Sequence, residues 1–249
     1  MKWKKIGKVL ILDKNEKNLS ETYLNELLTS NNVDTIIKIN NIYGTKRMPN
    51  IEILKGSDTE TIHKENGCFF KLDLSKVMWS KGNVNERLRI AKLIKPNETV
   101  LDMFAGIGYF SIPIGVHSKA KKIYSIEINP NSYGFLKENI ELNKINKDYN
   151  RMEAILGDSK ELTSNYKVDR IIMGYVKTTH HYLKIAIGSL NPGGILHYHE
   201  TVPLKLINTR PINRIKNAAG DRDVNIITIN KIKQYAPGVA HIVVDAQIN

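Results

Sequence analysis

The sequence predicts an α/β protein: a doubly wound, mostly parallel sheet that follows a small α+β unit. From about residue 84 onward, helix-length patterns alternate with short apolar runs, and strands separated by helices usually pair in parallel. Residues 224–248 contain instead two apolar runs around Ala-Pro-Gly, which predicts an antiparallel hairpin. With 249 residues, of which 41% are hydrophobic, the chain can bury a full core.

We expect residues 1–80 to form the small α+β domain and residues 81–249 the larger domain. In the first part, a short helix pattern follows Ser20, whose hydroxyl suits the N-cap position. Turn signals at residues 55–58 and 65–67 predict a β-rich stretch. The expected elements here are a strand at Lys8–Leu12, the helix at Ser20–Thr29 and a strand at Val33–Ile39.

In the second part, strands and helices are expected to alternate up to the final hairpin. Short apolar runs predict the strands, and longer stretches with apolar residues three or four positions apart predict the helices. The expected strands are Thr99–Asp102, Lys122–Glu127, Met152–Leu156, Arg170–Met173 and Gly194–His199; the expected helices are Val84–Ile94, one beginning at Gly108, Asn131–Asn143 and Tyr182–Ser189.

The charge balance favours a polyanionic partner such as nucleic acid. Lys and Arg number 37 against 25 Asp and Glu, which gives a formal net charge of +12 and a pI near 9.5. A lysine-rich composition that serves solubility alone gives the same charge. Composition therefore leaves both interpretations open.

Cysteine usage and hydropathy predict a cytoplasmic protein without a membrane or metal partner. Cys68 is the single cysteine, which excludes an intramolecular disulfide and a multi-cysteine metal site. The apolar run at Val9–Leu12 is too short for a signal peptide, and no run is long enough to span a bilayer. The adjacent His180 and His181 would point in different directions on a helix, so they make a poor metal pair.

The segment V-L-D-M-F-A-G-I-G-Y-F-S-I-P (100–113) predicts a nucleoside-binding loop. Gly106 and Gly108 follow an apolar strand and allow a ligand to approach the backbone, and the next helix offers free N–H groups. Ser111 occupies the position where a dinucleotide fingerprint has its third Gly or Ala. Glu127 ends the following strand about twenty residues further on, where a carboxylate usually accepts hydrogen bonds from ribose hydroxyls.

Two features favour S-adenosylmethionine (AdoMet) over NAD as the bound nucleoside. Asp102 precedes the glycines, where a carboxylate can reach the ammonium group of a methionyl moiety, which NAD lacks. The L-N-P-G-G-I-L segment (190–196) and the final hairpin match the last three strands of the class I AdoMet-dependent methyltransferase (Rossmann-like) fold. Asp158, in L-G-D-S, suits contact with the adenine amino group or, alternatively, a turn. A Rossmann-like domain for another nucleotide is the remaining alternative.

Four motifs resemble a family of enzymes that modify position 37 of tRNA. They are D-M-F-A-G-I-G-Y-F-S (102–111), E-I-N-P (127–130), E-N-I-E-L-N-K (138–144) and W-S-K-G-N-V-N-E-R-L-R (79–89). The family contains the guanosine-37 N1-methyltransferases and the wybutosine-synthesising protein 2 enzymes, and the resemblance covers almost the whole chain. It implies a monomeric enzyme that uses AdoMet and binds the anticodon loop of tRNA(Phe), with the N-terminal domain facing the tRNA.

Two departures from the methyltransferase pattern favour the wybutosine branch. The methyltransferases have S-P-R before their E-R and N-P-P after the fourth strand, whereas this chain has S-K-G-N (80–83) and M-G-Y-V-K-T-T-H (173–180). The resemblance thus implies transfer of the 3-amino-3-carboxypropyl (acp) group of AdoMet to carbon 7 of 4-demethylwyosine, with 5′-methylthioadenosine as by-product. N1-methylation of guanosine 37 is the alternative enzymatic function, and a non-catalytic RNA-binding protein is a third hypothesis.

The resemblance and the motifs together give a set of candidate site residues. Arg87 is expected to pair with the methionyl carboxylate, Tyr175 to stack on the base, and Lys177 to supply a cation. A carbon nucleophile must lose a proton after the transfer, and the sequence identifies no acceptor for it. The predicted cofactor-binding residues are Ser80, Arg87, Asp102, Phe104, Gly106, Gly108, Glu127, Asn129, Gly157, Asp158 and Gly174, and the predicted catalytic residues are Tyr175 and Lys177.

Basic side chains near both ends of the chain are candidates for phosphate contacts. They are Lys2, Lys4, Lys5 and Lys8, the pair at 46–47, and Arg210, Arg214 and Lys216.

Overall fold

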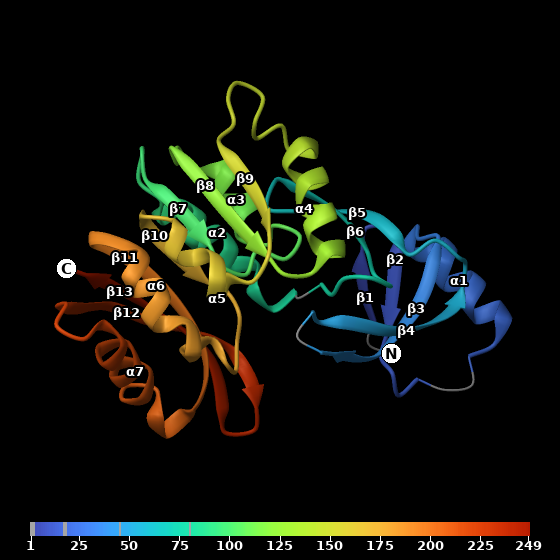
Figure 1. Cartoon of the computed structure of the whole chain (residues 1–249). Helices are drawn as coiled ribbons and strands as arrows, with labels where there is room; N and C mark the ends of the chain where they lie inside the picture. Colours follow the sequence, from blue (N-terminus) through green and yellow to red (C-terminus); the bar gives the residue numbers. More distant parts are fainter. Residues whose placement is uncertain (1–2, 17–18, 45, 80) are drawn as a thin grey trace.

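A computed structural model describes residues 3–16, 19–44, 46–79 and 81–249 (Figure 1). Within them, a seven-stranded sheet has the order β12-β13-β11-β10-β7-β8-β9. Neighbouring strands from β11 to β9 pair in parallel, whereas β13 and β12 are antiparallel. This arrangement confirms the predicted fold class. The strands are β7 (Thr99–Asp102), β8 (Lys122–Glu127), β9 (Met152–Leu156), β10 (Val168–Met173), β11 (Leu190–Pro203), β12 (Val224–Ala236) and β13 (Val239–Ile248).

Helices pack against both faces of this sheet, and three of them, α3, α7 and the single-turn helix at Ser159–Leu162, differ from the prediction. The helix expected from Gly108 begins at Ser111, because Gly106 and Gly108 have φ angles of +60° and +98°, outside the helical region. A helix at Arg210–Ala219 was not predicted, because only Pro211, Ile215 and Ala219 of this polar segment are buried. The helices are α2 (Val84–Leu93), α3 (Ser111–His117), α4 (Pro130–Leu142), α5 (Ser159–Leu162), α6 (Leu183–Ser189) and α7 (Arg210–Ala219).

The N-terminal part forms a separate four-stranded sheet, drawn in blue in Figure 1. Its order is β1-β2-β3-β4, and α1 covers one face with Leu24 and Leu27. As predicted, the Ser20 side chain caps α1, because its hydroxyl accepts a hydrogen bond from the Tyr23 amide at 3.2 Å. The elements are β1 (Trp3–Ile6), β2 (Val9–Leu12), α1 (Glu21–Asn31), β3 (Thr35–Tyr43) and β4 (Met48–Lys55).

Two of the lysines offered above as phosphate contacts are engaged inside this unit. Lys5 Nζ donates to the carbonyl oxygen of Asn31 at 2.6 Å, and Lys8 Nζ donates to Asn32 Oδ1 at 2.6 Å. Cations at a helix C-terminus satisfy carbonyl groups that lack partners in the helix. These lysines therefore stabilise the end of α1.

A two-stranded hairpin, β5 (Glu60–Glu65) and β6 (Cys68–Asp73), joins the N-terminal sheet to the larger part. The side chain of Asn139 on α4 accepts from the Lys71 amide at 2.6 Å and donates to the carbonyl oxygens of Lys71 and Ile107. One hydrophobic core contains Ile6 and Phe70 together with Ile90. Because this core includes residues from both sides of residue 80, the domain boundary there stays a prediction.

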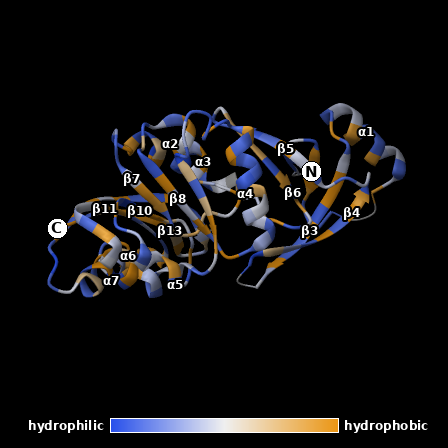
Figure 2. Ribbon diagram, turned by 45° about the horizontal axis from the view of Figure 1, so that its top comes forward, coloured by the Kyte–Doolittle hydropathy of each residue, from blue (hydrophilic) through white to orange (hydrophobic). Residues whose placement is uncertain are grey.

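Hydropathy follows the layers of the larger part. Figure 2 shows hydrophobic residues along the strands β7, β8 and β10, whereas α4 has one hydrophobic and one hydrophilic face. Among the described helices, none has the length and apolar character needed to cross a membrane.

Replacing Asn139 should destabilise the fold. Asn139→Ala removes three hydrogen bonds. It leaves backbone groups of the β5–β6 hairpin and of the loop that contains Gly106 and Gly108, called the glycine loop below, without these partners. We expect a loss of about 2–3 kcal/mol of unfolding free energy, measured by urea denaturation. Asn131→Ala, at an exposed position of the same helix, is the matched control. Equal stability of the two variants would contradict the role of Asn139.

Candidate active site

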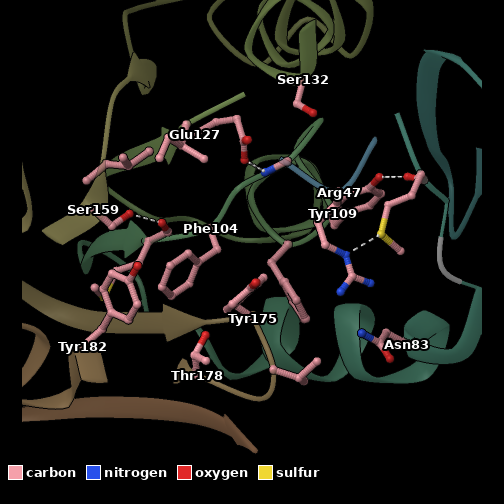
Figure 3. A pocket seen from close by; sticks show the side chains of 18 of the residues that line it. Arg47, Asn83, Phe104, Tyr109, Glu127, Ser132, Ser159, Tyr175, Thr178 and Tyr182 are labelled. Atoms are coloured by element: carbon pink, nitrogen blue, oxygen red, sulfur yellow. Dashed lines mark hydrogen bonds between the residues drawn. The ribbon is translucent and has the colours of Figure 1, made fainter. Parts of the chain in front are cut away.

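A cavity of about 490 Å³ lies beside the ends of β7, β8, β9 and β10, a volume that suits a nucleoside-sized ligand (Figure 3). In parallel sheets, ligands bind outside the carboxyl ends of the strands. Segments from the N-terminal part, α2 and the β12–β13 hairpin complete the wall. The wall includes Lys46, Arg47, Met78, Asn83, Arg87, Phe104, Gly106, Tyr109, Glu127, Asp158, Ser159, Gly174, Tyr175, Thr178, Tyr182, Lys233, Tyr235 and His241.

Glu127 binds the glycine loop to the end of β8. Its Oε2 accepts from the Gly106 amide and its Oε1 from the Asn129 amide, both at 2.7 Å. Gly106 has a φ of +60°, and a Cβ there would lie 2.4 Å from the Tyr109 ring, so glycine is required. Burial raises the pKa of Glu127. A carboxylate has about four acceptor positions, so Glu127 retains acceptor capacity toward the cavity that it lines.

Asp102 lies beneath this loop and does not line the cavity. It is fully buried; its Oδ1 accepts from the Phe104 amide at 3.2 Å and its Oδ2 from the Ser111 hydroxyl at 2.7 Å. Burial raises the pKa of Asp102 to about 6 although the Ser111 hydrogen bond opposes the shift. Ser111 therefore occupies the third-glycine position as the partner of Asp102. A contact between Asp102 and a methionyl ammonium stays a prediction.

Three predicted cofactor residues have local structural roles. The Asn129 side chain caps α4 through the Asn131 amide at 3.0 Å, donates to the carbonyl oxygen of Lys46 at 3.1 Å, and does not line the cavity. Asp158 Oδ1 accepts from the Lys160 amide at 2.8 Å, which caps α5, and Asp158 also borders the cavity. The Gly157 amide donates to the carbonyl oxygen of Glu127 at 3.0 Å. Their contacts with a cofactor remain predictions.

Aromatic side chains form one side of the cavity, as Figure 3 shows. The centroid of the Phe104 ring lies 5.4 Å from the centroid of the Tyr175 ring and 5.0 Å from that of the Tyr182 ring. A Cβ on Gly174 would lie 2.7 Å from the Phe110 ring, so the loop after β10 approaches the glycine loop only with glycine there. The structure thus brings Phe104, Gly174 and Tyr175 together at the cavity.

The loop after Tyr175 differs from the expected arrangement. Lys177 is exposed, has a φ of +75° and does not line the cavity. Thr178 borders the cavity instead, and Thr179 Oγ1 donates to the carbonyl oxygen of Tyr175 at 2.6 Å. The catalytic role of Lys177 therefore stays a prediction that its position does not support.

Cationic side chains from distant segments lie on the opposite wall. Arg87 is buried, pairs with Glu65 at 2.7 Å, and stacks with its guanidinium carbon 4.7 Å from the Trp79 ring. Lys233 also borders the cavity, and burial together with the Arg87 charge lowers its pKa. Arg47 Nε donates to the sulfur of Met78 at 3.3 Å. This wall suits an anionic group of a ligand.

Some predicted residues do not contribute to this geometry, and others were missed. Ser80 lies outside the described residues. Gly108 does not line the cavity. It has a φ of +98°, and a Cβ there would lie 2.4 Å from the Ile112 side chain, so a glycine is needed for the loop to pack against this side chain. Lys233, Tyr235 and His241 were missed because no local motif marks the terminal hairpin as part of a site. Among the described residues, no cluster of three or more His, Cys, Asp or Glu could hold a metal ion.

His241 on β13 lines the cavity from a buried position. Its Nε2 lies 3.0 Å from Nδ1 of His199 on β11. Burial, with a smaller effect of the Lys233 charge, lowers the pKa of His241 to about 4. Both imidazoles are neutral near pH 7, because burial also holds the pKa of His199 well below its usual value.

The fold and the cavity define the chain as a nucleoside-binding protein with the AdoMet-dependent methyltransferase fold. The glycine loop, the carboxylate at the end of β8 and the antiparallel β13 and β12 are its defining features. The family model described as "TRM5/TYW2 methyltransferase domain" matches residues 61–227. The chain belongs to this TRM5/TYW2 family, which confirms the resemblance inferred from the motifs.

Related proteins match the chain over nearly its whole length. It is 46% identical to "tRNA(Phe) (4-demethylwyosine(37)-C(7)) aminocarboxypropyltransferase" of Methanocaldococcus jannaschii, over 99% of this chain and 98% of that protein. The crystal structure of M. jannaschii TYW2 in complex with AdoMet has a TM-score of 0.80 at 42% identity, covering 100% and 99% of the two chains. The complex of aTrm5 and tRNALeu has a TM-score of 0.87 at 31% identity, covering 100% and 72%.

Acidification should destabilise the protein through His241. The pKa of this group is about 4 in the folded protein against 6.5 ordinarily, so the unfolded state binds more protons between these values. Stability therefore falls as the pH decreases, by about 2 kcal/mol between pH 7 and pH 5. Urea denaturation of the wild type and of His241→Gln at both pH values measures this contribution. The variant should lose about 2 kcal/mol less than the wild type; equal losses would be inconsistent with the lowered pKa.

Proposed function

We propose that this protein transfers the acp group of AdoMet to carbon 7 of 4-demethylwyosine at position 37 of tRNA(Phe). The observation that supports this most strongly is its end-to-end similarity to the M. jannaschii enzyme of that name. The proposal includes action as a cytoplasmic monomer on the anticodon loop, with 5′-methylthioadenosine as by-product. A tRNA substrate agrees with the net charge of +12.

The residues of the cavity fit AdoMet. Gly106 and Gly174 border the cavity without side chains of their own, and Glu127 offers acceptor positions for ribose hydroxyls. Asp158 borders the cavity where it can accept from the adenine amino group, and Arg87 provides a cation for the methionyl carboxylate. AdoMet supplies a sulfonium that activates the three carbons attached to it. The group that transfers is the one whose carbon faces the nucleophile.

The loop after β10 favours acp transfer over methylation. In this chain Gly174, Tyr175 and Val176 border the cavity, where the methyltransferases of the family are expected to have N-P-P. Tyr175 offers a stacking surface for the base, an interaction of about 1–3 kcal/mol. Its ring lies 5.4 Å from that of Phe104, which belongs to the glycine loop. A base held by Tyr175 would therefore stand next to the bound nucleoside.

The N-terminal part is proposed to bind the tRNA. Lys46 and Arg47 belong to it and border the cavity, which makes them better candidates for a phosphate of nucleotide 37 than Lys5 and Lys8. Arg210 and Arg214 are also occupied, because both pair with Glu200, at 2.8 and 2.5 Å. The tRNA would thus reach the cavity along the side where the two parts of the chain meet.

Label transfer tests the proposed function. The protein is incubated with tRNA(Phe) that contains 4-demethylwyosine and with AdoMet labelled on either the carboxyl or the methyl carbon. We expect carboxyl label alone in the tRNA, since the acp group includes that carbon and the methyl stays on sulfur. Unmodified tRNA(Phe) with guanosine at position 37 is the control.

Two outcomes would overturn the proposal. Methyl label in the unmodified tRNA would favour N1-methylation of guanosine 37. Absence of both labels, while calorimetry detects binding of AdoMet and tRNA, would favour a non-catalytic RNA-binding protein.

A further inference from the structure

The sheet topology places the two buried histidines beside the loop that follows β10. Strand β11 lies between β10 and β13. Met173, the last residue of β10, pairs with Tyr198, so His199 is level with Gly174 on the neighbouring strand. The His199 ring packs edge-on against Phe110, 5.2 Å away, and a Cβ on Gly174 would touch that same ring. Gly174, Phe110 and His199 are therefore contiguous.

His241 extends this group into the cavity. Its partner across the strand pair is Thr201, two positions beyond His199 on β11, and its Nε2 lies 3.0 Å from His199 Nδ1. No hydrogen bond of its other nitrogen, Nδ1, is found in the part of the chain that the structure describes. His241 contributes the single imidazole among the described residues that border the cavity.

We propose that Nδ1 of His241 accepts the proton that carbon 7 of the base loses during acp transfer, with His199 as a positioning residue. This inference rests on the proposed function. In the tautomer proposed here, the Nε2–H of His241 points to Nδ1 of His199, 3.0 Å away, which leaves a lone pair on Nδ1 of His241. The same contact holds the His241 ring against His199, which packs on Phe110 beside the loop after β10.

The proton must leave for the reaction to balance. The ring electrons at carbon 7 form a bond to the γ carbon of the methionyl group, and the bond between this carbon and sulfur breaks with its electron pair remaining on sulfur. The sulfonium becomes a neutral thioether, and the positive charge passes to the base. The bond between carbon 7 and hydrogen then breaks, its electron pair restores the aromatic ring, and the proton moves to His241, which later releases it to solvent.

The surroundings of His241 suit this role. Burial favours an uncharged imidazole, and the charge of Lys233, which borders the same cavity, acts in the same direction. Such a ring is unprotonated at neutral pH, in agreement with a pKa lowered to about 4. A weak base suffices, because the cationic intermediate, in which carbon 7 holds both the acp group and the hydrogen, is a strong acid.

Other groups of the cavity are less suited to accept the proton. Glu127 holds the backbone N–H groups of Gly106 and Asn129, and its remaining acceptor positions are assigned to the ribose hydroxyls. Asp158 lies after β9, at the far edge of the sheet from β13. The ammonium group of Lys233 has donors only and no lone pair that could accept a proton. His241 remains the neutral base that contacts through His199 and Phe110 connect to the loop after β10.

An isotope effect in a variant tests this role. His241→Gln keeps a polar group where Nε2 contacts His199 but removes Nδ1. Single-turnover acp transfer is measured on tRNA(Phe) with hydrogen or deuterium on carbon 7 of 4-demethylwyosine, with and without added imidazole. We expect a rate about 100-fold below the wild type, an isotope effect larger than that of the wild type, and partial rescue by imidazole. His180→Gln, a histidine that does not border the cavity, should behave as the wild type does.

The outcomes separate this inference from the proposed function. A wild type that transfers no carboxyl label refutes the proposed function itself. A wild type that transfers label, together with a variant of unchanged rate, overturns the role of His241. So does a slower variant without increased isotope effect or rescue, because a structural defect would slow both isotopes equally. AdoMet binding by calorimetry verifies folding of the variant, and His241→Asn replaces it if binding is lost.

Discussion

The carboxylate of Glu127 is the group on which the geometry of the cavity depends. It accepts hydrogen bonds from the backbone amides of Gly106 and Asn129 at 2.7 Å each. One side chain therefore fixes both the glycine loop and the turn into α4. Asn129 in turn donates to the carbonyl oxygen of Lys46. The position of the N-terminal segment at the cavity is therefore connected to the end of β8 through two consecutive hydrogen bonds.

A second set of buried polar contacts holds the opposite wall. His197 Nδ1 lies 2.6 Å from Asp245 on β13, and its Nε2 lies 2.8 Å from Arg170 on β10. Asp245 also pairs with Arg89 on α2 at 2.6 Å. These contacts link the terminal hairpin to the helix that carries Arg87. Because buried charges are tolerated only when they are paired and hydrogen-bonded, this network maintains the hairpin and the cationic wall in one arrangement.

The sequence predicted the parts of the site that follow local rules. The glycine loop, Glu127 and the strand ends are recognisable because a short segment contains both the strand and the loop that it positions. Lys233 on β12 and His241 on β13 were not predictable, since they reach the cavity only because the β12–β13 hairpin pairs through β13 with β11, whose residues lie more distant in the chain. The hydrogen bond between Asp102 and Ser111 was not predictable for a similar reason: the two residues are close in sequence, but the burial of both depends on the complete sheet.

We propose that the Glu127 carboxylate both fixes the glycine loop and binds the nucleoside. Calorimetric affinities of AdoMet and 5′-methylthioadenosine for the wild type and for Glu127→Gln test this dual role. Hydrogen bonds to a charged group contribute about 1.5–3 kcal/mol, so both ligands should lose affinity by the same factor, about 10- to 100-fold. Unchanged affinities, or a loss confined to AdoMet, would contradict this dual role of Glu127, because the two ligands share the nucleoside and differ in the methionyl arm.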